Sequence, residues 1–517
     1  MLPSIPYACP ACVDGRVAGH RRHRRPRFHR VRVSHVGGSV DVVTLDDQST
    51  DGVLRSVGEA EAYVASVCFK HGPPTLAGVE IEWMLHRPGR PADPVDLDAV
   101  RAALGPHRPA SLDPASHAAP LPAGGTVTVE PGGQIEISSA PADSLEALLG
   151  ALGDDAAHLH GLLAEHGLRP HDRAADPVRP ARRLLDLPRY AAMECVFDGV
   201  GPHGRSGMCS TAAVQVSLDA GPAAGIAERW AVLHELGPVL LAAFANSPVQ
   251  HGRRTGWKSS RQACWLSLDP ARTAPPPTAT PGTDPAAAWA RRVVTTPLLC
   301  VRGTGTWSVP AGVTFADWVS GRARGGVLDR PPTLADLDYH VSTLFPPVRP
   351  HGYLEVRYVD GQAGDDWALP TAVLLALTSS GPVVDRVRER CEPVRDEWVA
   401  AARHGLDHPG LAAAAADLFP LACDVLAAAD HPLTTGPGAV LARLREVTER
   451  RVLQGRCPAD DTDPAEQGAG PTADPFPPGL HLGSALPGAP AAREVTGREP
   501  GRSAVDTADQ AAQEDVA

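Results

Sequence analysis

Hydrophobic and polar residues alternate in four short segments of the chain. Apolar side chains occupy every second position in residues 79–85, 134–138, 214–219 and 353–359. A period of two in runs rich in β-branched residues is typical of strands that are buried on one face only. The turn residues Pro131, Gly132 and Gly133 separate residues 126–130 from 134–138. We therefore expect a hairpin and a sheet that is at least partly antiparallel.

Helical spacing of apolar residues dominates between these strands. Leu54, Val57, Val64 and Cys68 fall on one helical face, and Gly72 with the two prolines after it ends the pattern. Further helices are predicted at residues 97–104, 145–168, 224–245, 371–377, 382–403 and 411–428. A few half-buried strands among many helices predict an α+β protein with a mainly antiparallel sheet flanked by helices.

Composition divides the chain into three parts. Residues 1–48 contain the basic run HRRHRRPRFHRVR, which has no amphipathic period; we interpret this part as a disordered extension or as sequence outside the native protein, with a nucleic-acid arm as the alternative. Residues 49–454 hold the predicted helices and strands and form the folded domain. In residues 455–517, Pro, Gly, Ala and acidic residues replace large apolar ones, which predicts a disordered tail.

Overall composition argues against several classes of protein. The 517 residues carry a formal net charge of −12, which disfavours a dedicated binder of nucleic acid or of a membrane surface. No run of about 18 apolar residues occurs, so no membrane span is predicted. The ten cysteines have no regular spacing, and Cys9 and Cys12 form a lone Cys-x-x-Cys pair, so we expect neither a disulfide framework nor a zinc site. These features favour a soluble cytoplasmic protein.

The polar positions of the predicted strands carry a recurring set of side chains. If the strands share one sheet, one face presents Glu80, Glu82, Glu136, Gln215, Glu355 and Arg357. Four carboxylates without lysine partners repel one another unless a cation lies among them, and hard oxygen ligands suit Mg²⁺ or Mn²⁺ bound together with substrate phosphates. The alternative is that each polar face is only solvated, which is the usual interpretation for a single strand.

Two arginine-bearing loops accompany these strands. Residues 256–261 (GWKSSR) form a compact polar loop that ends in Arg261, and residues 343–349 lead into the strand with Glu355. Arginine binds carboxylates and phosphates through paired hydrogen bonds, although a lone arginine in this arginine-rich chain is most simply a surface charge. The chain has no P-loop, no dinucleotide-binding glycine pattern, no nucleophile elbow and no HExxH motif.

Several motifs taken together resemble one enzyme family. The segments GVEIEW, CFKHGPP, GGQIEISSAP, CSTAAVQVSLD, AFANSP, GWKSSRQACW and HVSTLFPPVRPHGYLEVRYVDGQ occur in family order within residues 50–450. This set is similar to the glutamate–cysteine ligase family of carboxylate–amine ligases, and within it to the actinobacterial ergothioneine-pathway branch. The resemblance implies a curved sheet with a polar concave face, similar to that of glutamine synthetase, in a catalytic domain spanning residues 49–454.

The resemblance also implies a reaction. In this family ATP phosphorylates the γ-carboxylate of L-glutamate, and the amine of L-cysteine then displaces phosphate from the γ-glutamyl phosphate. The products are γ-glutamylcysteine, ADP and phosphate. The implied partners of the protein are therefore these small-molecule substrates, and neither nucleic acid nor a membrane.

Motif position implies roles for particular residues. The ligands of Mg²⁺, or of Mn²⁺, would be Glu80, Glu82, Glu136 and Glu355. Arg357 would stabilise the transferring phosphoryl group, and Arg261 would hold a carboxylate of glutamate. Gln134 and Gln215 would line the site. Relatives often have Asn at the position of Ser217, so a contact from that side chain would be shorter or mediated by water.

Two other functions stay open at this point. The first is a carboxylate–amine ligase that uses another amine, because small changes in an acceptor pocket alter discrimination. The second is a non-catalytic relative that binds glutamate or nucleotide, against which the presence of all four glutamates and Arg357 argues. An acyl phosphate needs protection from water, so we also expect a covering loop, with residues 256–265 or 273–284 as candidates.

Overall fold

The computed structural model describes residues 52–276, 284–303, 305–461, 466 and 468–476. The predicted N-terminal extension and residues 477–517 of the predicted tail lie outside these described residues, and so does most of the Pro-rich loop at residues 273–284. The described residues belong to one unit of the chain, Met1–Leu482.

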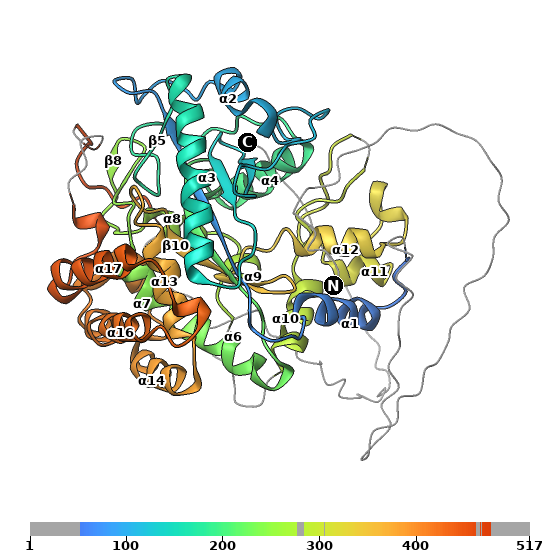
Figure 1. Ribbon diagram of the computed structural model, residues 1–517. Coiled ribbons are helices and arrows are strands. Elements are labelled where there is room, and N and C mark those ends of the chain that lie inside the picture. The colour runs from blue at the N-terminus through green and yellow to red at the C-terminus, as the bar shows by residue number, and fades with distance from the viewer. Residues whose placement is uncertain (1–51, 277–283, 304, 462–465, 467, 477–517) are drawn as a thin grey trace, which may run out of the picture. The chain divides into compact units, whose positions relative to one another are not determined.

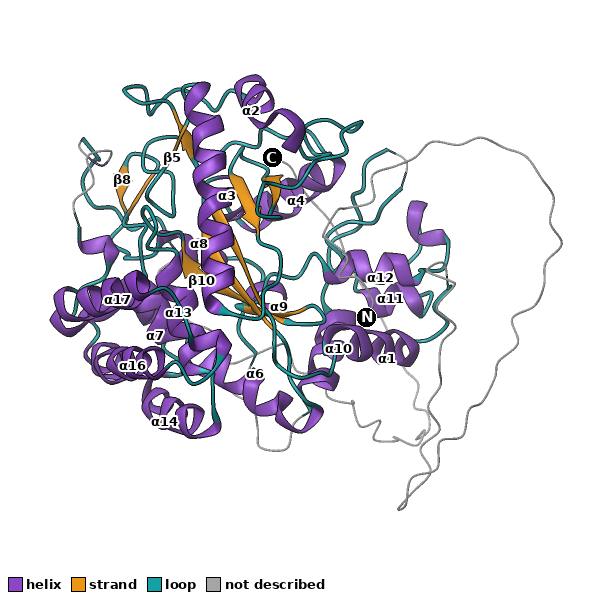
Figure 2. Cartoon of the chain, viewed as in Figure 1, coloured by secondary structure: helices purple, strands orange, loops and turns teal. Residues whose placement is uncertain are grey.

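Six strands form one sheet in the order β3-β4-β1-β6-β10-β9, and each neighbouring pair is antiparallel (Figure 2). In chain order the strands are β1 Ala77–Trp83, β3 Thr126–Val129, β4 Ile135–Ser138, β6 Ala213–Leu218, β9 Val348–Pro350 and β10 Leu354–Asp360. The four segments of alternating polarity all lie in this sheet, and β3 and β4 form the predicted hairpin. The predicted fold class, α+β with an antiparallel sheet flanked by helices, is confirmed. Two small ladders pair β2 Leu85–His86 with β5 Arg169–Pro170 and β7 Val249–Gln250 with β8 Arg253–Arg254.

Helices account for most of the remaining regular structure. Their bounds are α1 Val57–Cys68, α2 Leu97–Leu104, α3 Leu145–Glu165, α4 Pro188–Val200, α5 His203–Cys209, α6 Ile226–Glu235, α7 Gly237–Ala243, α8 Ser260–Leu266, α9 Pro270–Thr273, α10 Pro285–Thr295, α11 Phe315–Val319, α12 Leu334–Val341, α13 Ala368–Leu377, α14 Gly381–Cys391, α15 Trp398–His404, α16 Pro409–Ala428 and α17 Gly438–Arg450. Side-chain caps start several of them: Ser144 accepts from the N–H of Ala147, and Thr333 forms a capping box with Asp336.

One face of the sheet is apolar and packs on helices. Val79, Ile81 and Trp83 of β1 are buried in the main core, and α3 passes across the strands (Figure 1). The ring of Trp83 lies 4.8 Å from that of His160 on α3, between centroids. On β10, the hydroxyl of Tyr358 donates to the carbonyl of Leu233 at 3.0 Å. Because side chains alternate along a strand, the polar residues of β1 project from the opposite face.

Two predicted helices are each broken into two. Residues 224–245 fold as α6 and α7, and the break precedes Pro238, which has no N–H to donate and is tolerated in the first turn of α7. Residues 382–403 fold as α14 and α15, which are separated by the 3₁₀ turn Glu392–Val394 with its own proline. In both places a proline overrides a continuous apolar pattern.

The most apolar long helix is a core helix. By length and composition alone α16 could cross a membrane, with a mean hydropathy of 1.7 over its best window. Its residues Leu411, Leu418 and Phe419 are fully buried, and it packs against α7, α13 and α17. Burial against three helices explains the apolar composition of α16 within the folded unit.

The folded unit continues past residue 454, where we expected a tail to begin. Cys457, Glu466 and Phe476 are buried, and the N–H of Ala459 donates to the carbonyl of Ala245 at 2.9 Å. The predicted boundary is therefore too early for the described residues between 455 and 476. The composition of this segment is misleading because charged side chains, rather than a large apolar surface, hold it in place.

Candidate functional site

The polar positions of the four predicted strands lie on one face of the sheet. Glu82 on β1 stands opposite Glu136 on β4, and Glu80 stands opposite Gln215 on β6. Glu355 on β10 stands opposite Ser217 of β6, which in turn pairs with Gly78 of β1. Neighbouring strands are about 4.8 Å apart, so the side chains of Glu80, Glu82 and Glu136 are close neighbours. The expectation that these residues converge is thus met.

Protein donors already hold two of these carboxylates. Glu82 accepts a hydrogen bond from the amide of Gln215 at 2.7 Å and another from the backbone N–H of Ala213 at 2.9 Å. Glu136 accepts from the hydroxyl of Thr128 on β3 at 2.5 Å. The carbonyl oxygen Oε1 of Gln215 is buried and has no hydrogen-bond partner among the described residues. A buried acceptor without a donor is costly, so this oxygen is suited to an electropositive ligand.

Two arginines flank the fourth carboxylate. Arg349 on β9 binds both oxygens of Glu355, with Nε–Oε2 at 2.6 Å and Nη2–Oε1 at 3.0 Å. Nη1 of Arg357 donates to Oε1 of the same carboxylate at 3.1 Å. Burial alone would raise the pKa of Glu355, but the two guanidinium groups lower it to about 2. Glu355 is therefore ionised, whereas the neighbouring glutamates lack such arginine partners and repel one another.

The other three glutamates of the set have raised pKa values. Burial and the charge of Glu355 raise the pKa of Glu80 to about 7. Burial, Glu80 and Glu130 together raise the pKa of Glu136 well above its ordinary value. Burial also raises the pKa of Glu82, against the opposing effect of Arg261. A positive charge among these side chains would favour their ionised forms and so oppose all three shifts.

A bulge in β10 adds a carboxylate that the sequence pattern hides. The register with β6 shifts between Val356 and Val359, so that Asp360 pairs with Ala213 and shares the side of the sheet with Glu355. Strict alternation would have sent Asp360 to the opposite face. Asp360 is fully buried and accepts hydrogen bonds from the hydroxyls of Ser247 and Ser259, each at 2.8 Å.

Arg261 lies in the first turn of a helix and not in a loop. Ser259 caps α8 by accepting from the N–H of Gln262 at 3.1 Å, which makes Arg261 the second residue of the helix. Nη2 of Arg261 donates to the carbonyl of Arg357 at 2.8 Å, and Nη1 lies 3.7 Å from Asp360. Nη1 is buried and makes no hydrogen bond within the described part of the chain. One donor of Arg261 is thus left for a ligand.

The helical placement of Arg261 also bears on the covering loop. Trp257 and Ser260 are buried, so the segment at residues 256–265 is part of the packed structure. It is unsuited to the role of a freely moving cover, which we had considered for it.

Gln134 is engaged with the main chain. Its Nε2 donates to the carbonyls of Thr211 at 3.0 Å and Met208 at 3.3 Å, and its Oε1 accepts from the N–H of Gly132 at 2.9 Å. These bonds tie the β3–β4 turn to the segment that precedes β6. The lining role that we expected for Gln134 stays a prediction, and the geometry gives this side chain a positioning task.

Sequence reasoning missed three further members of the site. Thr128 and Glu130 alternate with valines along residues 126–130 and could have been found from that pattern. Burial and the charge of Glu82 raise the pKa of Glu130 to about 7. Arg349 lies in the arginine-bearing segment that we had singled out, but its pairing with Glu355 depends on the short strand β9, which has no period of its own.

No group of three or more His, Cys, Asp or Glu side chains among the described residues is arranged so as to hold a metal ion. The side-chain oxygens of Glu82, Glu136 and Glu355 point to protein donors instead. The donor set nevertheless fits a hard divalent cation. It consists of carboxylates, a buried amide oxygen without a partner among the described residues, and glutamates whose pKa values are raised by burial and by their mutual repulsion. The metal-ligand roles of the four glutamates stay predictions.

A buried set of carboxylates beside arginines, on one face of an antiparallel sheet in an α+β protein, suits an enzyme that binds phosphorylated substrates. Residues 76–473 match glutamate–cysteine ligase family 2. The chain therefore belongs to this family and is a ligase, as the motifs in its sequence indicate.

Two curated relatives agree with this assignment. The chain is 39% identical to the glutamate–cysteine ligase EgtA of Mycolicibacterium smegmatis, over 79% of this chain and 91% of that protein. It is 38% identical to the glutamate–cysteine ligase EgtA of Mycobacterium tuberculosis, over 81% of this chain and 92% of that protein. Among solved structures, the match to a glutamate–cysteine ligase of Francisella tularensis in complex with AMP covers 78% of this chain and 98% of that chain. The identity is 11% and the TM-score is 0.39.

Proposed function

We propose that this protein joins the γ-carboxylate of L-glutamate to the amine of L-cysteine, with ATP as the phosphoryl donor, and that its product γ-glutamylcysteine is used in ergothioneine synthesis. The observation that carries the reaction is the convergence of Glu80, Glu82, Glu136 and Glu355 on one face of the sheet, beside Arg357. The ergothioneine role rests on the similarity to proteins named EgtA.

The proposed cation is Mg²⁺, with Mn²⁺ as a substitute. Glu80, Glu82, Glu136 and Glu355 would together hold one or more such ions, and the unpartnered Oε1 of Gln215 would add a neutral oxygen. When bound, such a cation neutralises charge on phosphate oxygens. Gly78 and Ser217, the two residues in line with Glu355 across the sheet, are small.

In this proposal, two arginines bind the remaining negative charges of the substrates. Arg357, held by Glu355, would face the transferring phosphoryl group and stabilise its developing charge. Nη1 of Arg261, which makes no hydrogen bond among the described residues, would bind a carboxylate of glutamate. Gln215 lines the same face, and Gln134 fixes the turn beside it. The γ-glutamyl phosphate then forms by positioning and charge neutralisation, without a protein nucleophile.

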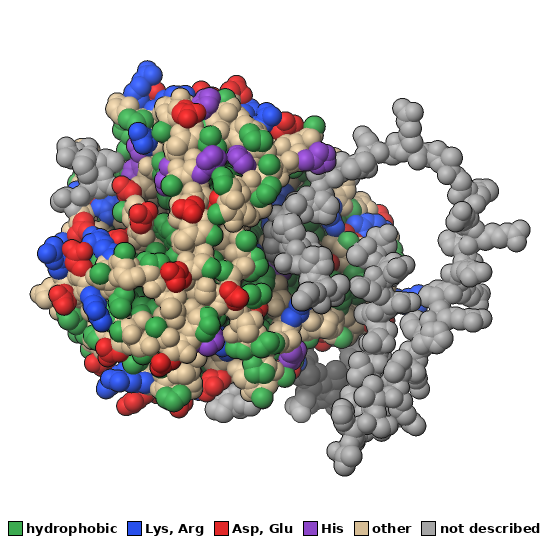
Figure 3. Space-filling model, in the orientation of Figure 1, with side chains coloured by type: hydrophobic (Ala, Val, Ile, Leu, Met, Phe, Trp, Pro, Cys, Tyr) green, Lys and Arg blue, Asp and Glu red, His purple; other side chains and the backbone are tan. Residues whose placement is uncertain are grey.

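We further propose a cytoplasmic enzyme that acts on small molecules. The eight cysteines in the described part of the chain are all free thiols, which suits a reducing compartment. On the face drawn in Figure 3, acidic and basic side chains are interspersed. The described residues on that face therefore form no continuous basic patch for nucleic acid.

Phosphate release by the purified full-length protein tests the function. The protein is given ATP and Mg²⁺ with glutamate alone, and then with glutamate plus each of several amino acids, and products are identified by mass. Phosphate release that needs both glutamate and cysteine, with γ-glutamylcysteine as product, supports the proposal. Turnover with a different amine identifies a carboxylate–amine ligase of other specificity. Nucleotide binding without turnover on any amine identifies a non-catalytic relative.

A further inference from the structure

The segment that follows residue 455 packs beside the helix that carries Arg261. Asp460 pairs with Lys258, and Asp474 accepts from the indole N–H of Trp257 at 2.9 Å. Phe476 packs edge-on against the ring of Trp257 at 5.1 Å between centroids. The N–H of Ala473 donates to the carbonyl of Arg254 at 3.0 Å. The segment therefore covers residues 254–258, which lead directly into α8.

A single buried arginine, Arg173, makes three polar contacts with this segment. Nη1 of Arg173 donates to the carbonyl of Pro458 at 2.9 Å, and Nη2 donates to the carbonyl of Asp461 at 2.6 Å. Nε of Arg173 lies 2.8 Å from the carboxylate of Glu466. The side chains of Arg173 and Glu466 are 6% and 4% exposed. A buried ion pair needs further polar partners such as these carbonyls, because each uncompensated charge would cost several kcal/mol.

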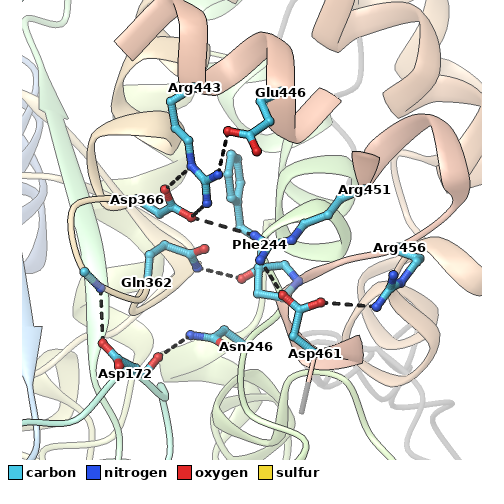
Figure 4. A network of polar contacts seen from close by, with 12 residues as sticks. Asp172, Phe244, Asn246, Gln362, Asp366, Arg443, Glu446, Arg451, Arg456 and Asp461 are labelled. Carbon is cyan, nitrogen blue, oxygen red and sulfur yellow. Dashed lines mark hydrogen bonds and ion pairs between the residues drawn. The ribbon is translucent and has the colours of Figure 1, made fainter. Parts of the chain in front are cut away.

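The same guanidinium group contacts the neighbourhood of the active site. Nη1 of Arg173 also donates to Oδ1 of Asn246 at 2.7 Å. Asn246 is 1% exposed, and its Nδ2 donates to the carbonyls of Asp172 at 2.8 Å and Gly361 at 2.7 Å. Figure 4 shows the hydrogen bond from Asn246 to the carbonyl of Asp172. Asn246 thereby joins the residues around Arg173 to the end of β10.

From Asn246 the contacts lead to Arg261. The backbone N–H of Asn246 donates to Oδ2 of Asp360 at 2.9 Å, and Nη1 of Arg261 lies 3.7 Å from Oδ1 of the same carboxylate. Ser247 donates to Asp360 and accepts from the backbone N–H of Arg261 at 3.1 Å. The guanidinium of Arg261 is thus oriented by a carboxylate whose own donors depend on residues 246 and 247.

We propose that Arg173 is a positioning residue for Arg261, acting through Asn246 and Asp360, and that the described part of the segment 458–466 holds Arg173 in place. The expected effect on glutamate rests on the proposed function, in which Arg261 binds a carboxylate of that substrate. Arg173 itself touches no substrate. Misplacing a binding group by about 1 Å through a distant contact can change rates by up to 100-fold, so loss of Arg173 has a measurable effect.

The test compares two arginine substitutions in the full-length protein. Arg173→Gln removes the contacts to Asn246 and to the segment. Arg179→Gln is the matched control, because Arg179 is also largely buried, pairs with Asp176 at 2.6 Å and donates to the carbonyl of Leu85 at 2.7 Å, with no bond to Asn246. Steady-state kinetics give KM for glutamate, cysteine and ATP. Hydrogen–deuterium exchange of the amides of Asn246 and Arg261, relative to the amides of β6, gives a readout that needs no turnover.

Arg173→Gln is expected to raise KM for glutamate by about tenfold, with KM for cysteine within about twofold, and to speed exchange at Asn246 and Arg261. Glu466→Gln, which keeps the packing, is expected to shift both readouts in the same direction by less, and serves if Arg173→Gln fails to fold. Equal behaviour of the Arg173 and Arg179 variants in both readouts would overturn the inference. If the wild type shows no ligase turnover, the proposed function fails, and the exchange data still decide the positioning role.

Discussion

Arg349 holds both oxygens of Glu355 across the edge of the sheet, with the two residues directly opposite each other on β9 and β10. Nε–Oε2 is 2.6 Å and Nη2–Oε1 is 3.0 Å. The carboxylate is 1% exposed and the guanidinium 16%. Bidentate pairing of this kind is among the stronger polar contacts in proteins. It keeps Glu355 ionised in surroundings where the neighbouring glutamates have raised pKa values.

Removal of Arg349 should lower the free energy of unfolding in a pH-dependent way. The pKa of Glu355 falls from 4.5 to about 2 on folding, because two guanidinium groups overcome the effect of burial. The stabilisation is therefore complete above pH 4.5 and is lost as the pH falls towards 2. Arg349→Gln should cost about 1–3 kcal/mol at pH 7 and less at pH 4, measured by urea unfolding.

The control for this prediction is Arg322→Gln, which breaks an exposed pair with Asp317. It should change stability by less than about 0.5 kcal/mol at either pH. An equal loss for Arg349→Gln at pH 7 and pH 4 would mean that packing, and not the charge of Glu355, accounts for the effect.

The raised pKa of Glu80 predicts that stability depends on pH with the opposite sign. Its folded-state pKa of about 7 lies above its ordinary value of 4.5. The folded state thus binds the proton more tightly, and this residue makes the protein less stable as the pH rises from 4.5 to 7. Glu80→Gln should therefore stabilise the metal-free protein at pH 8, by roughly 1–3 kcal/mol, and have little effect at pH 5.

Added Mg²⁺ should reduce this gain, because a cation at the site stabilises the ionised form of Glu80 in the wild type. Thermal unfolding of both proteins at pH 5 and pH 8, once with EDTA and once with added Mg²⁺, provides the comparison. If Glu80→Gln stabilises the protein equally at both pH values, the negative charge of Glu80 is not the cause of the effect.

Sequence patterns predicted the polar face well, because strand alternation fixes which side chains share a face once the strands pair. Glu80, Glu82, Glu136, Gln215 and Glu355 needed no information beyond that period. The pairing itself, which brings Glu355 within reach of Glu80, depends on long-range contacts that the period does not contain.

The missed features have physical causes as well. Asp360 escaped detection because a bulge reverses the alternation at its position. Arg261 was assigned to a loop because α8 is only seven residues long, and the serine cap that starts it lies within a polar run. The segment after residue 455 was assigned to a tail because it is held by Arg173, Lys258 and Trp257, contacts that composition does not reveal.

Glu136→Gln tests the metal set directly. The change keeps the shape of the side chain and its contact with Thr128 but removes one negative charge from the cluster. Turnover should fall by at least about 100-fold, and a higher Mg²⁺ concentration should be needed for half-maximal activity. Glu355→Gln should lower turnover and raise the Mg²⁺ requirement in the same way.

The matched control is Glu146→Gln, on the exposed first turn of α3. It should leave kcat and the Mg²⁺ requirement unchanged. Near-normal activity of Glu136→Gln would remove Glu136 from the set of metal ligands, whereas a loss of activity with an unchanged Mg²⁺ requirement would give it a role other than metal binding.

Two glycines in helices should respond to alanine in opposite directions. A Cβ on Gly237, at the start of α7, would lie 2.0 Å from the ring of Trp398, whereas a Cβ on Gly150 in α3 would meet nothing within 4 Å. Gly237→Ala should therefore destabilise the protein by about 1–3 kcal/mol through overpacking. Gly150→Ala should stabilise it by up to about 1 kcal/mol, because alanine loses less backbone entropy in a helix. Thermal unfolding of the two variants checks both signs, and a stable Gly237→Ala protein would show that α15 can move away from α7.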